Sequence, residues 1–320
     1  MKIVVYGPEK RVGILQGPGI VDAARATSSH RGEGKAVPSD LAGFIAAGQP
    51  ALDACAAALG HAGTKDTVAA ASVRIHAPRA AEARVACAGA NFADHAVRMA
   101  AKMRGRDAPV LTAEMARAQQ RKEGIRGFWK VNRDYAASGD DVIYPAKARR
   151  FDYEGEIAIV IGLGGKDIKP ADARRHIWGA TLLFDWSIRS PREDNAATRF
   201  AMTKNFDTGC SIGPCIAVGE LNPFDAEVET LVNGEVRQHF STREMVYDFA
   251  EFIAHLSEDF TLHPGDIISG GTAAGTAADS SDRLPDGSQP NDLFLKPGDR
   301  VETKNPAIGS LSARIVAKPA

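Results

Sequence analysis

The feature of this chain that most constrains its fold is an acidic segment that runs directly into an apolar one. Residues 151–161 read FDYEGEIAIVI, and the β-branched run at the end is typical of a strand buried on both faces. Side chains alternate along a strand, so Asp152, Glu154 and Glu156 share one face, with neighbouring Cβ atoms roughly 7 Å apart. Three carboxylates there repel one another. Either a divalent cation with oxygen ligands neutralises them, or the strand end faces water.

A second apolar strand, at residues 180–185, also ends in a carboxylate. Its sequence is ATLLFD, so Asp185 would lie at the mouth of a buried strand. That position suits a third metal ligand, although an aspartate that ends a strand in an Asx turn is common. The sequence therefore predicts a group of carboxylates and favours a metal site over a solvated strand end.

Three further segments carry groups suited to catalysis. His95 follows a strand and a Gly/Asn loop at the start of a predicted helix, where a histidine can act as a general base near neutral pH. Lys204 could place a cation beside the carboxylates. The loop GGTAAGT at 270–276 could hold a carboxylate or phosphate with its backbone N–H groups. It lacks the lysine of a P-loop, so we exclude a nucleotide site of that kind.

Local patterns in the second half of the chain predict a hairpin and a helix. Two runs of alternating hydrophobicity flank Asn233-Gly234, the turn pair that tolerates positive φ. Ser241 and Glu244 form a capping box, which predicts that a helix with an apolar stripe begins there. The polar, turn-rich segment 279–290 is predicted to be a mobile loop.

Composition narrows the class of protein. Lysine and arginine total 39 and aspartate and glutamate 40, so a net charge of -1 favours neither nucleic acid nor a membrane surface as a partner. The most apolar stretch is far shorter than the ~20 residues of a membrane helix. The four cysteines are too few for a disulfide framework. We therefore expect a cytoplasmic protein with reduced cysteines.

Eight short motifs, taken in order, resemble the fumarylacetoacetate hydrolase family. They are GANFADH at 89–95, FWK at 128–130, DYEGE at 152–156, DWSIR at 185–189, KNFD at 204–207, NGE at 233–235, LHPGD at 262–266 and GT at 271–272. The resemblance implies an α+β, mainly β fold, with a mixed β-roll catalytic domain at 81–320 and a small N-terminal α/β domain at 1–80. It also implies a homodimer and a bound Mg²⁺ or Mn²⁺ ion.

The same resemblance assigns roles to individual residues. The metal ligands are Glu154, Glu156 and Asp185, the catalytic residues are His95, Lys204 and Arg189, and Lys130 and Thr272 contact substrate. His95 resembles the base that activates water, Arg189 an arginine beside the metal, and Thr272 a threonine that contacts the substrate carboxylate.

The family resemblance implies an enzyme that acts on a small 2-oxo or 1,3-diketo acid. We expect a divalent-metal-dependent hydrolase that cleaves a C–C bond through an enolate. One alternative is a lyase, a decarboxylase or hydratase, that acts on a 2-oxo dicarboxylic acid with the same metal site. An alternative of another class is a metal-binding protein that has lost catalysis and serves as a binding or scaffold unit. The three retained carboxylates argue against the last.

Two arginines depart from the pattern of the family. Hydrolytic relatives often carry a glutamate three residues after the histidine, where this chain has Arg98, and Arg192 stands where many carry glutamine. Because a guanidinium binds a carboxylate bidentately, both arginines favour a substrate with a second carboxylate. Arg98 also lies in a basic segment, residues 95–130, that is a candidate mobile lid.

Overall fold

The computed structural model describes residues 1–31, 36–103, 111–189, 199–281, 290 and 292–319. Within these residues most strands belong to two sheets. One has eleven strands in the order β4-β3-β2-β1-β13-β11-β10-β16-β6-β7, with β5 added beside β1, and the other has five in the order β15-β14-β17-β18-β8. The predicted α+β, mainly β fold is confirmed, and both sheets are mixed because β6–β16 and β8–β18 are parallel pairs.

The eleven strands of the large sheet come from nearly the whole chain. They are β1 (Lys2–Tyr6), β2 (Arg11–Gln16), β3 (Gly19–Asp22), β4 (Thr67–Ala69), β5 (Ile75–His76), β6 (Val85–Ala88), β7 (Gly127–Lys130), β10 (Gly155–Ile161), β11 (Ile177–Asp185), β13 (Cys210–Ala217) and β16 (Ile267–Ser269). The five-stranded sheet comprises β8 (Asp141–Ile143), β14 (Glu227–Val232), β15 (Glu235–Ser241), β17 (Arg300–Asn305) and β18 (Gly309–Val316). A short pair joins β9 (Phe151–Asp152) to β12 (Ser187–Ile188).

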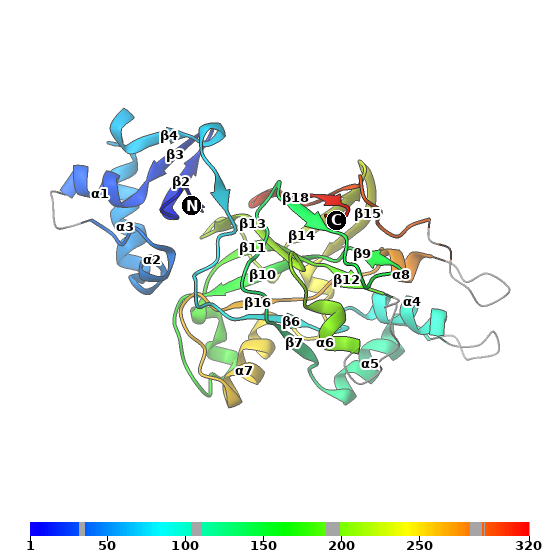
Figure 1. Ribbon diagram of the computed structural model, residues 1–320. Helices are drawn as coiled ribbons and strands as arrows, with labels where there is room; N and C mark the ends of the chain where they lie inside the picture. Colours follow the sequence, from blue (N-terminus) through cyan, green and yellow to red (C-terminus); the bar gives the residue numbers. More distant parts are fainter. Residues whose placement is uncertain (32–35, 104–110, 190–198, 282–289, 291, 320) are drawn as a thin grey trace.

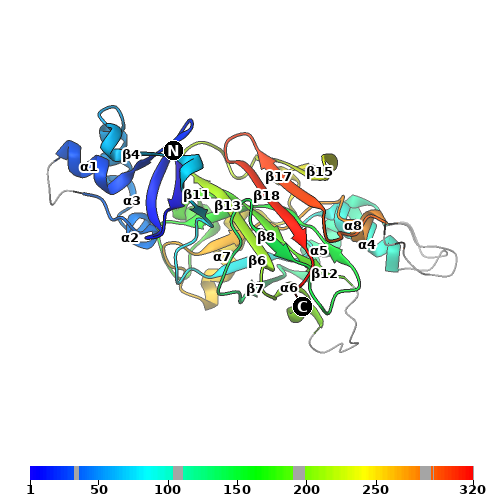
Figure 2. The ribbon, with the colours of Figure 1, turned by 45° about the horizontal axis from the view of Figure 1, so that its top comes forward.

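Helices flank the sheets at both ends of the molecule. They are α1 (Ala23–Arg31), α2 (Leu41–Ala46), α3 (Gly48–Leu59), α4 (Ala93–Met103), α5 (Ala113–Glu123), α6 (Arg199–Lys204), α7 (Phe249–Asp259) and α8 (Ala277–Ser280). In Figures 1 and 2, α1–α3 lie with the first strands at one end, while α4 and α8 lie together at the other. No helix in the described ranges is long and apolar enough to span a bilayer.

The N-terminal strands continue the eleven-stranded sheet. β1 pairs antiparallel with β13, so that Ile3 lies opposite Ile216, and β2–β4 follow outward from β1. Both isoleucines are fully buried in one apolar cluster that also contains Phe44 of α2. The predicted boundary near residue 80 thus falls between segments that share a sheet and a core, and two separate domains remain a prediction.

The two sheets pack closely where β10 begins. The first residue of this strand is Gly155, and a Cβ added to it would lie 2.1 Å from the Thr230 hydroxyl of β14 and 2.8 Å from that of Thr303 of β17. Only glycine allows this approach, which places Glu154 and Glu156, on either side of it, at the junction of the sheets. The hairpin is as predicted, with positive φ at Asn233 and Gly234.

The predicted start of the last long helix is wrong. The capping box of Ser241 and Glu244 closes only a single 3₁₀ turn, Thr242–Glu244, and α7 begins at Phe249 with Asp248 as its cap. Asn91 explains the break, because it accepts hydrogen bonds from the backbone N–H groups of residues 246 and 247 and holds this stretch extended. A tertiary contact therefore interrupts a pattern that is locally helical.

A buried ion pair joins the first three strands. Asp22 is almost fully buried and accepts hydrogen bonds from Arg11 Nε and the Tyr6 hydroxyl, both at 2.6 Å, and from the backbone of Arg25 at 2.8 Å. Burial opposes ionisation of Asp22, but the hydrogen bonds from Arg11 and Tyr6 outweigh it, so the pKa of this carboxyl is lowered. Burial and the contact with Asp22 raise the pKa of Tyr6 to about 12.

Asp22→Asn is expected to lower the free energy of unfolding by about 3 kcal/mol, because Arg11 loses its buried partner. A carboxyl whose pKa is lower in the folded than in the unfolded state stabilises the fold above the unfolded value of ~4, and this stabilisation is lost as pH falls through the folded value. Urea denaturation should therefore show a difference between parent and variant that is constant near pH 6 and shrinks below pH ~4. A difference that does not change with pH would contradict this assignment.

Candidate active site

Three carboxylates meet in the centre of the large sheet. Glu154, Glu156 and Asp185 are all buried, and one oxygen of each lies within 4.8 Å of the others. β10 and β11 are antiparallel neighbours, and the Asp185 N–H donates to the Glu154 carbonyl at 3.0 Å. The structure brings together the three residues that the sequence marks as metal ligands, and their role as ligands stays a prediction.

Two lysines neutralise part of this charge. Lys204 Nζ, at the end of α6, donates to Glu154, to Asp185 at 2.7 Å and to the Ser187 hydroxyl at 2.7 Å. Lys130 Nζ, on β7, donates to Asp185 at 2.7 Å, to the Gly209 carbonyl at 2.9 Å and to the Lys204 carbonyl. The Lys130 side chain is 0% exposed. Since an ammonium has three N–H donors, the protein occupies all of them, and Lys130 supports Asp185 in this structure.

Arg189 connects the carboxylates to a fourth acid. Its Nε donates to Asp152 at 2.9 Å, and a terminal nitrogen donates to Glu154. Burial alone would raise the pKa of Glu154, but the charges of Lys204 and Arg189 lower it overall, and a proton on His95 would act in the same direction. Glu154 is therefore ionised and lies within the electrostatic reach of His95.

Glu156 shows that the donor set fits a divalent cation. Four carboxylates face three cationic side chains, and among the described residues Glu156 has no cation within ion-pair distance, only a hydrogen bond from the Ser269 hydroxyl. Burial, followed by the negative charges of Asp185 and Glu154, raises the pKa of Glu156 well above its usual value. A divalent cation bound by the carboxylate oxygens of the site would neutralise this excess of negative charge.

His95 pairs with an aspartate far along the chain. His95, in the first turn of α4, has its Nδ1 2.6 Å from Asp279 Oδ2, and Asp279 lies in α8. The side chains are 11% and 0% exposed. Because an ionised carboxylate only accepts hydrogen bonds, Nδ1 carries a proton, and Nε2 is the nitrogen at which the ring can take up or release a second one. This arrangement suits a general base.

Asp279 is a site residue that was not predicted from the sequence, which placed it in a mobile loop at 279–290. The start of that segment is instead a buried helical turn, while residues 282–289 lie outside the described part of the chain. A local signal was present. Thr276 stands three residues before Asp279, and its hydroxyl accepts the Asp279 N–H as an N-cap. Gly275 N–H also donates to Asp279 at 3.0 Å, which holds the carboxylate in place.

The remaining predicted substrate contacts lie near the site or outside the described residues. Thr272 Oγ1 donates to the Gly155 carbonyl at 3.0 Å and accepts from Gln238 Nε2 at 2.8 Å, so its hydroxyl braces the start of β10. Arg98 is exposed on α4, one turn after His95. Arg192 lies in the undescribed range 190–198. Whether any of them contacts substrate stays a prediction.

Part of the candidate lid is anchored to the body of the protein. In α5, Arg117 donates to the Met245 carbonyl at 2.9 Å, and Arg121 forms an ion pair with Glu251 and covers the ring of Tyr247. The lid hypothesis therefore concerns at most the chain around α4, of which 104–110 lies outside the described residues.

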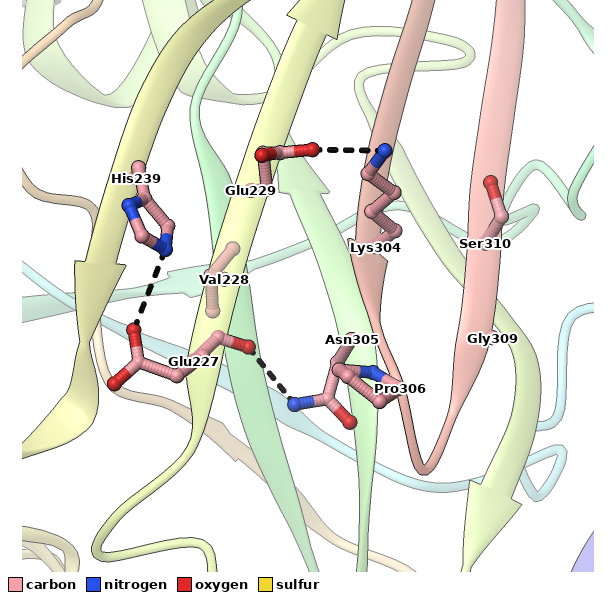
Figure 3. A pocket seen from close by; sticks show the side chains of 9 residues that line it. All are labelled: Glu227, Val228, Glu229, His239, Lys304, Asn305, Pro306, Gly309 and Ser310. Carbon is pink, nitrogen blue, oxygen red and sulfur yellow. Dashed lines mark hydrogen bonds and ion pairs between the residues drawn. The ribbon is translucent and has the colours of Figure 1, made fainter.

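A groove on the five-stranded sheet does not contribute to this site. It measures about 440 Å³ and is lined by Glu227, Val228, Glu229, His239, Lys304, Asn305, Pro306, Gly309 and Ser310. Figure 3 shows that its charged side chains already pair with one another, Glu229 with Lys304 at 2.7 Å and Glu227 with His239 at 3.6 Å. None of the three metal-site carboxylates lines it.

The structure thus combines a group of three buried carboxylates that could hold a metal ion with a buried His–Asp pair. The sequence model of the family described as Fumarylacetoacetate (FAA) hydrolase C-terminal matches residues 84–316. The chain belongs to the fumarylacetoacetate hydrolase family, and is an enzyme acting on small molecules, as the sequence analysis predicted.

Relatives and solved structures extend this comparison. The chain is 31% identical over 282 residues to the mitochondrial oxaloacetate tautomerase FAHD2A of Bos taurus, covering 88% of this chain and 81% of the relative. It is 32% identical over 247 residues to oxaloacetate tautomerase YisK of Bacillus subtilis, covering 76% and 73%. The structure of maleylpyruvate hydrolase from Sphingobium sp. SYK-6, in complex with manganese(II) and pyruvate, has the same fold, with a TM-score of 0.73 at 21% identity over the full length of both chains.

Proposed function

We propose that this protein is a divalent-metal-dependent enzyme that converts a 2-oxo dicarboxylic acid through its enolate. The observation that carries this proposal is the His95–Asp279 pair near the carboxylates, because it provides a base of fixed orientation near a centre suited to Mg²⁺ or Mn²⁺. The relatives named oxaloacetate tautomerase and the manganese- and pyruvate-bound structure support the substrate class and the metal.

Each residue of the site has a separate role in enolate formation. Glu154, Glu156 and Asp185 would hold the ion, which supplies a Lewis acid that polarises the 2-oxo group. His95 Nε2 takes the proton from the carbon next to that group. Asp279 then keeps the resulting imidazolium in the same orientation. Lys204 adds positive charge beside the carboxylates, which favours an anionic substrate.

Two reactions of such substrates involve an enolate. In tautomerisation His95 moves a proton between carbon and the 2-oxo oxygen, with no other reactant. In C–C hydrolysis, the reaction expected from the sequence, His95 takes a proton from water and the resulting hydroxide adds to a second carbonyl. The C–C bond then breaks, its electron pair forms the enolate, and the imidazolium of His95 returns the proton to the enolate carbon. The His95–Asp279 pair keeps hydrolysis as the second candidate, because Asp279 supplies the acidic partner that Arg98 fails to provide.

Product analysis tests the proposal. The purified protein, loaded with Mg²⁺ or Mn²⁺, is given the enol form of oxaloacetate and, separately, an acylpyruvate. Faster loss of the enol absorbance at unchanged oxaloacetate concentration supports tautomerisation, two carboxylic acids from the acylpyruvate support hydrolysis, and carbon dioxide with pyruvate supports the lyase alternative. Absence of all three, in protein that binds the metal, would contradict the proposed enolate chemistry.

Arg98→Glu is expected to lower the preference for dicarboxylic over monocarboxylic substrates about tenfold, expressed as the ratio of their kcat/KM values. The reason is that a cation one helical turn from His95 attracts the second carboxylate, whereas a glutamate repels it. Lys122→Glu, which makes the same charge change at an exposed position of α5, is the matched control. A ratio that changes equally in both variants would assign the effect to net charge alone.

We also propose a homodimer and a cytoplasmic location, both taken from the sequence analysis. Light scattering tests the first, since a dimer has twice the chain mass of 33.9 kDa. Subcellular fractionation tests the second, and recovery of the protein in mitochondria, the location printed for the relative from Bos taurus, would contradict it.

A further inference from the structure

Asp152 is the fourth carboxylate of the site, and every oxygen of it is occupied by the protein. Its side chain is 0% exposed. Oδ1 accepts the N–H groups of Ala277 at 2.8 Å and Tyr153 at 3.0 Å, while Oδ2 accepts Arg189 Nε at 2.9 Å and the N–H of Ala278 at 3.1 Å. A carboxylate with four donors has no lone pair left for an ion, so Asp152 is not a metal ligand in this arrangement.

These contacts connect the two halves of the active site. On one side, Arg189 lies between Asp152 and Glu154, so Asp152 determines how strongly the guanidinium attracts Glu154. On the other side, Ala277 and Ala278 begin α8, the four-residue turn that carries Asp279 and thereby holds His95. A continuous set of described contacts thus leads from Glu154 through Arg189 and Asp152 to the first turn of α8, which carries Asp279.

We propose that Asp152 is a positioning residue that couples the metal-binding carboxylates to the orientation of the base. Without its charge, Arg189 would keep only Glu154 as an acidic partner among the described residues and would hold that carboxylate away from the ion. At the same time, a neutral side chain would bind the N–H groups at the start of α8 more weakly, and Asp279 would no longer hold the His95 ring in one orientation. Loss of the Asp152 charge is therefore expected to weaken both metal binding by the carboxylates and the orientation of His95.

The alternative is that Asp152 only stabilises the fold, as many buried acids do. A purely structural residue would lower the stability of the protein without changing either metal affinity or the hydrogen bond of His95. Asp22 provides the matched control, because it is equally buried, pairs with an arginine and accepts a backbone N–H, yet belongs to the N-terminal strands.

The test uses Asp152→Asn in the full-length protein, with two readouts that need no substrate. Calorimetry with Mn²⁺ should show an affinity about 10-fold weaker than that of the parent, as is typical when a partner of a metal ligand is removed. NMR of ¹⁵N-histidine-labelled protein should show the His95 Nδ1 proton shifted upfield, because its short hydrogen bond to Asp279 is loosened. Asp22→Asn should leave both readouts unchanged.

Arg189→Lys is a second variant, which keeps the positive charge but removes the Nε donor to Asp152. It should also shift the His95 signal, although no described contact joins Arg189 to His95. If Asp152→Asn does not fold, the His95 shift in Arg189→Lys tests whether Asp152 positions the base. Parent-like Mn²⁺ affinity in Asp152→Asn, or an unmoved His95 signal in the folded variants, would overturn the proposal. The inference rests on the proposed roles of His95 and the carboxylates, but a failure of the proposed reaction would leave both readouts interpretable.

Discussion

Asp279→Asn is expected to lower kcat by roughly 10²–10⁴-fold, the range that a positioned general base contributes. The carboxylate of Asp279 keeps the proton of His95 on Nδ1. An asparagine amide can instead donate to Nδ1, and this would move the proton to Nε2, the atom that must accept a proton from substrate or water. The variant should fold, because asparagine has nearly the same shape and can still accept the Gly275 N–H.

The double variant provides a sharper test of this pair. Residues that act as one unit lose their effect together, so His95→Asn combined with Asp279→Asn should be no slower than His95→Asn alone. Steady-state kinetics of the two single variants and the double variant, with thermal melting as the control for folding, measures this. Losses that multiply, or Asp279→Asn that retains more than about a tenth of the parent kcat, would show that Asp279 merely fills space.

Glu156→Gln is expected to remove metal binding and activity without destabilising the metal-free protein. Glu156 is a buried carboxylate with a hydrogen bond from Ser269 and two negatively charged neighbours, so a neutral isostere loses a ligand but also relieves repulsion. Mn²⁺ affinity measured by calorimetry should fall at least about 100-fold, and the melting temperature without metal should stay the same or rise.

Asp185→Asn is the contrasting control for this prediction. It should also lose metal affinity, but it leaves Lys130 without its buried carboxylate partner and leaves Lys204 with Glu154 alone, so it should lower the free energy of unfolding by about 3 kcal/mol. Equal destabilisation in both variants would contradict the uneven distribution of charge in the site. Retention of full metal affinity in Glu156→Gln would remove Glu156 from the ligand set.

Features that depend on neighbouring residues could be predicted from the sequence. The alternation of side chains along a strand placed Glu154 and Glu156 on one face, and the turn at Asn233-Gly234 follows from the backbone conformations that those two residues allow. The family, and with it the α+β architecture, was recognisable because eight short motifs occur in one order along 84–316. Each of these inferences uses residues close together in the chain or their order.

Only the tertiary structure decided the features that depend on residues far apart. His95 and Asp279 are separated by 184 positions, so no spacing rule could pair them. The burial of the Lys130 ammonium against Asp185 also depends on distant residues, and the helix expected at Ser241 starts at Phe249 because Asn91 holds the intervening backbone. The physical reason is common to all three. A buried polar group must find partners wherever the fold places them, and hydrogen bonds across the chain then outweigh local preferences.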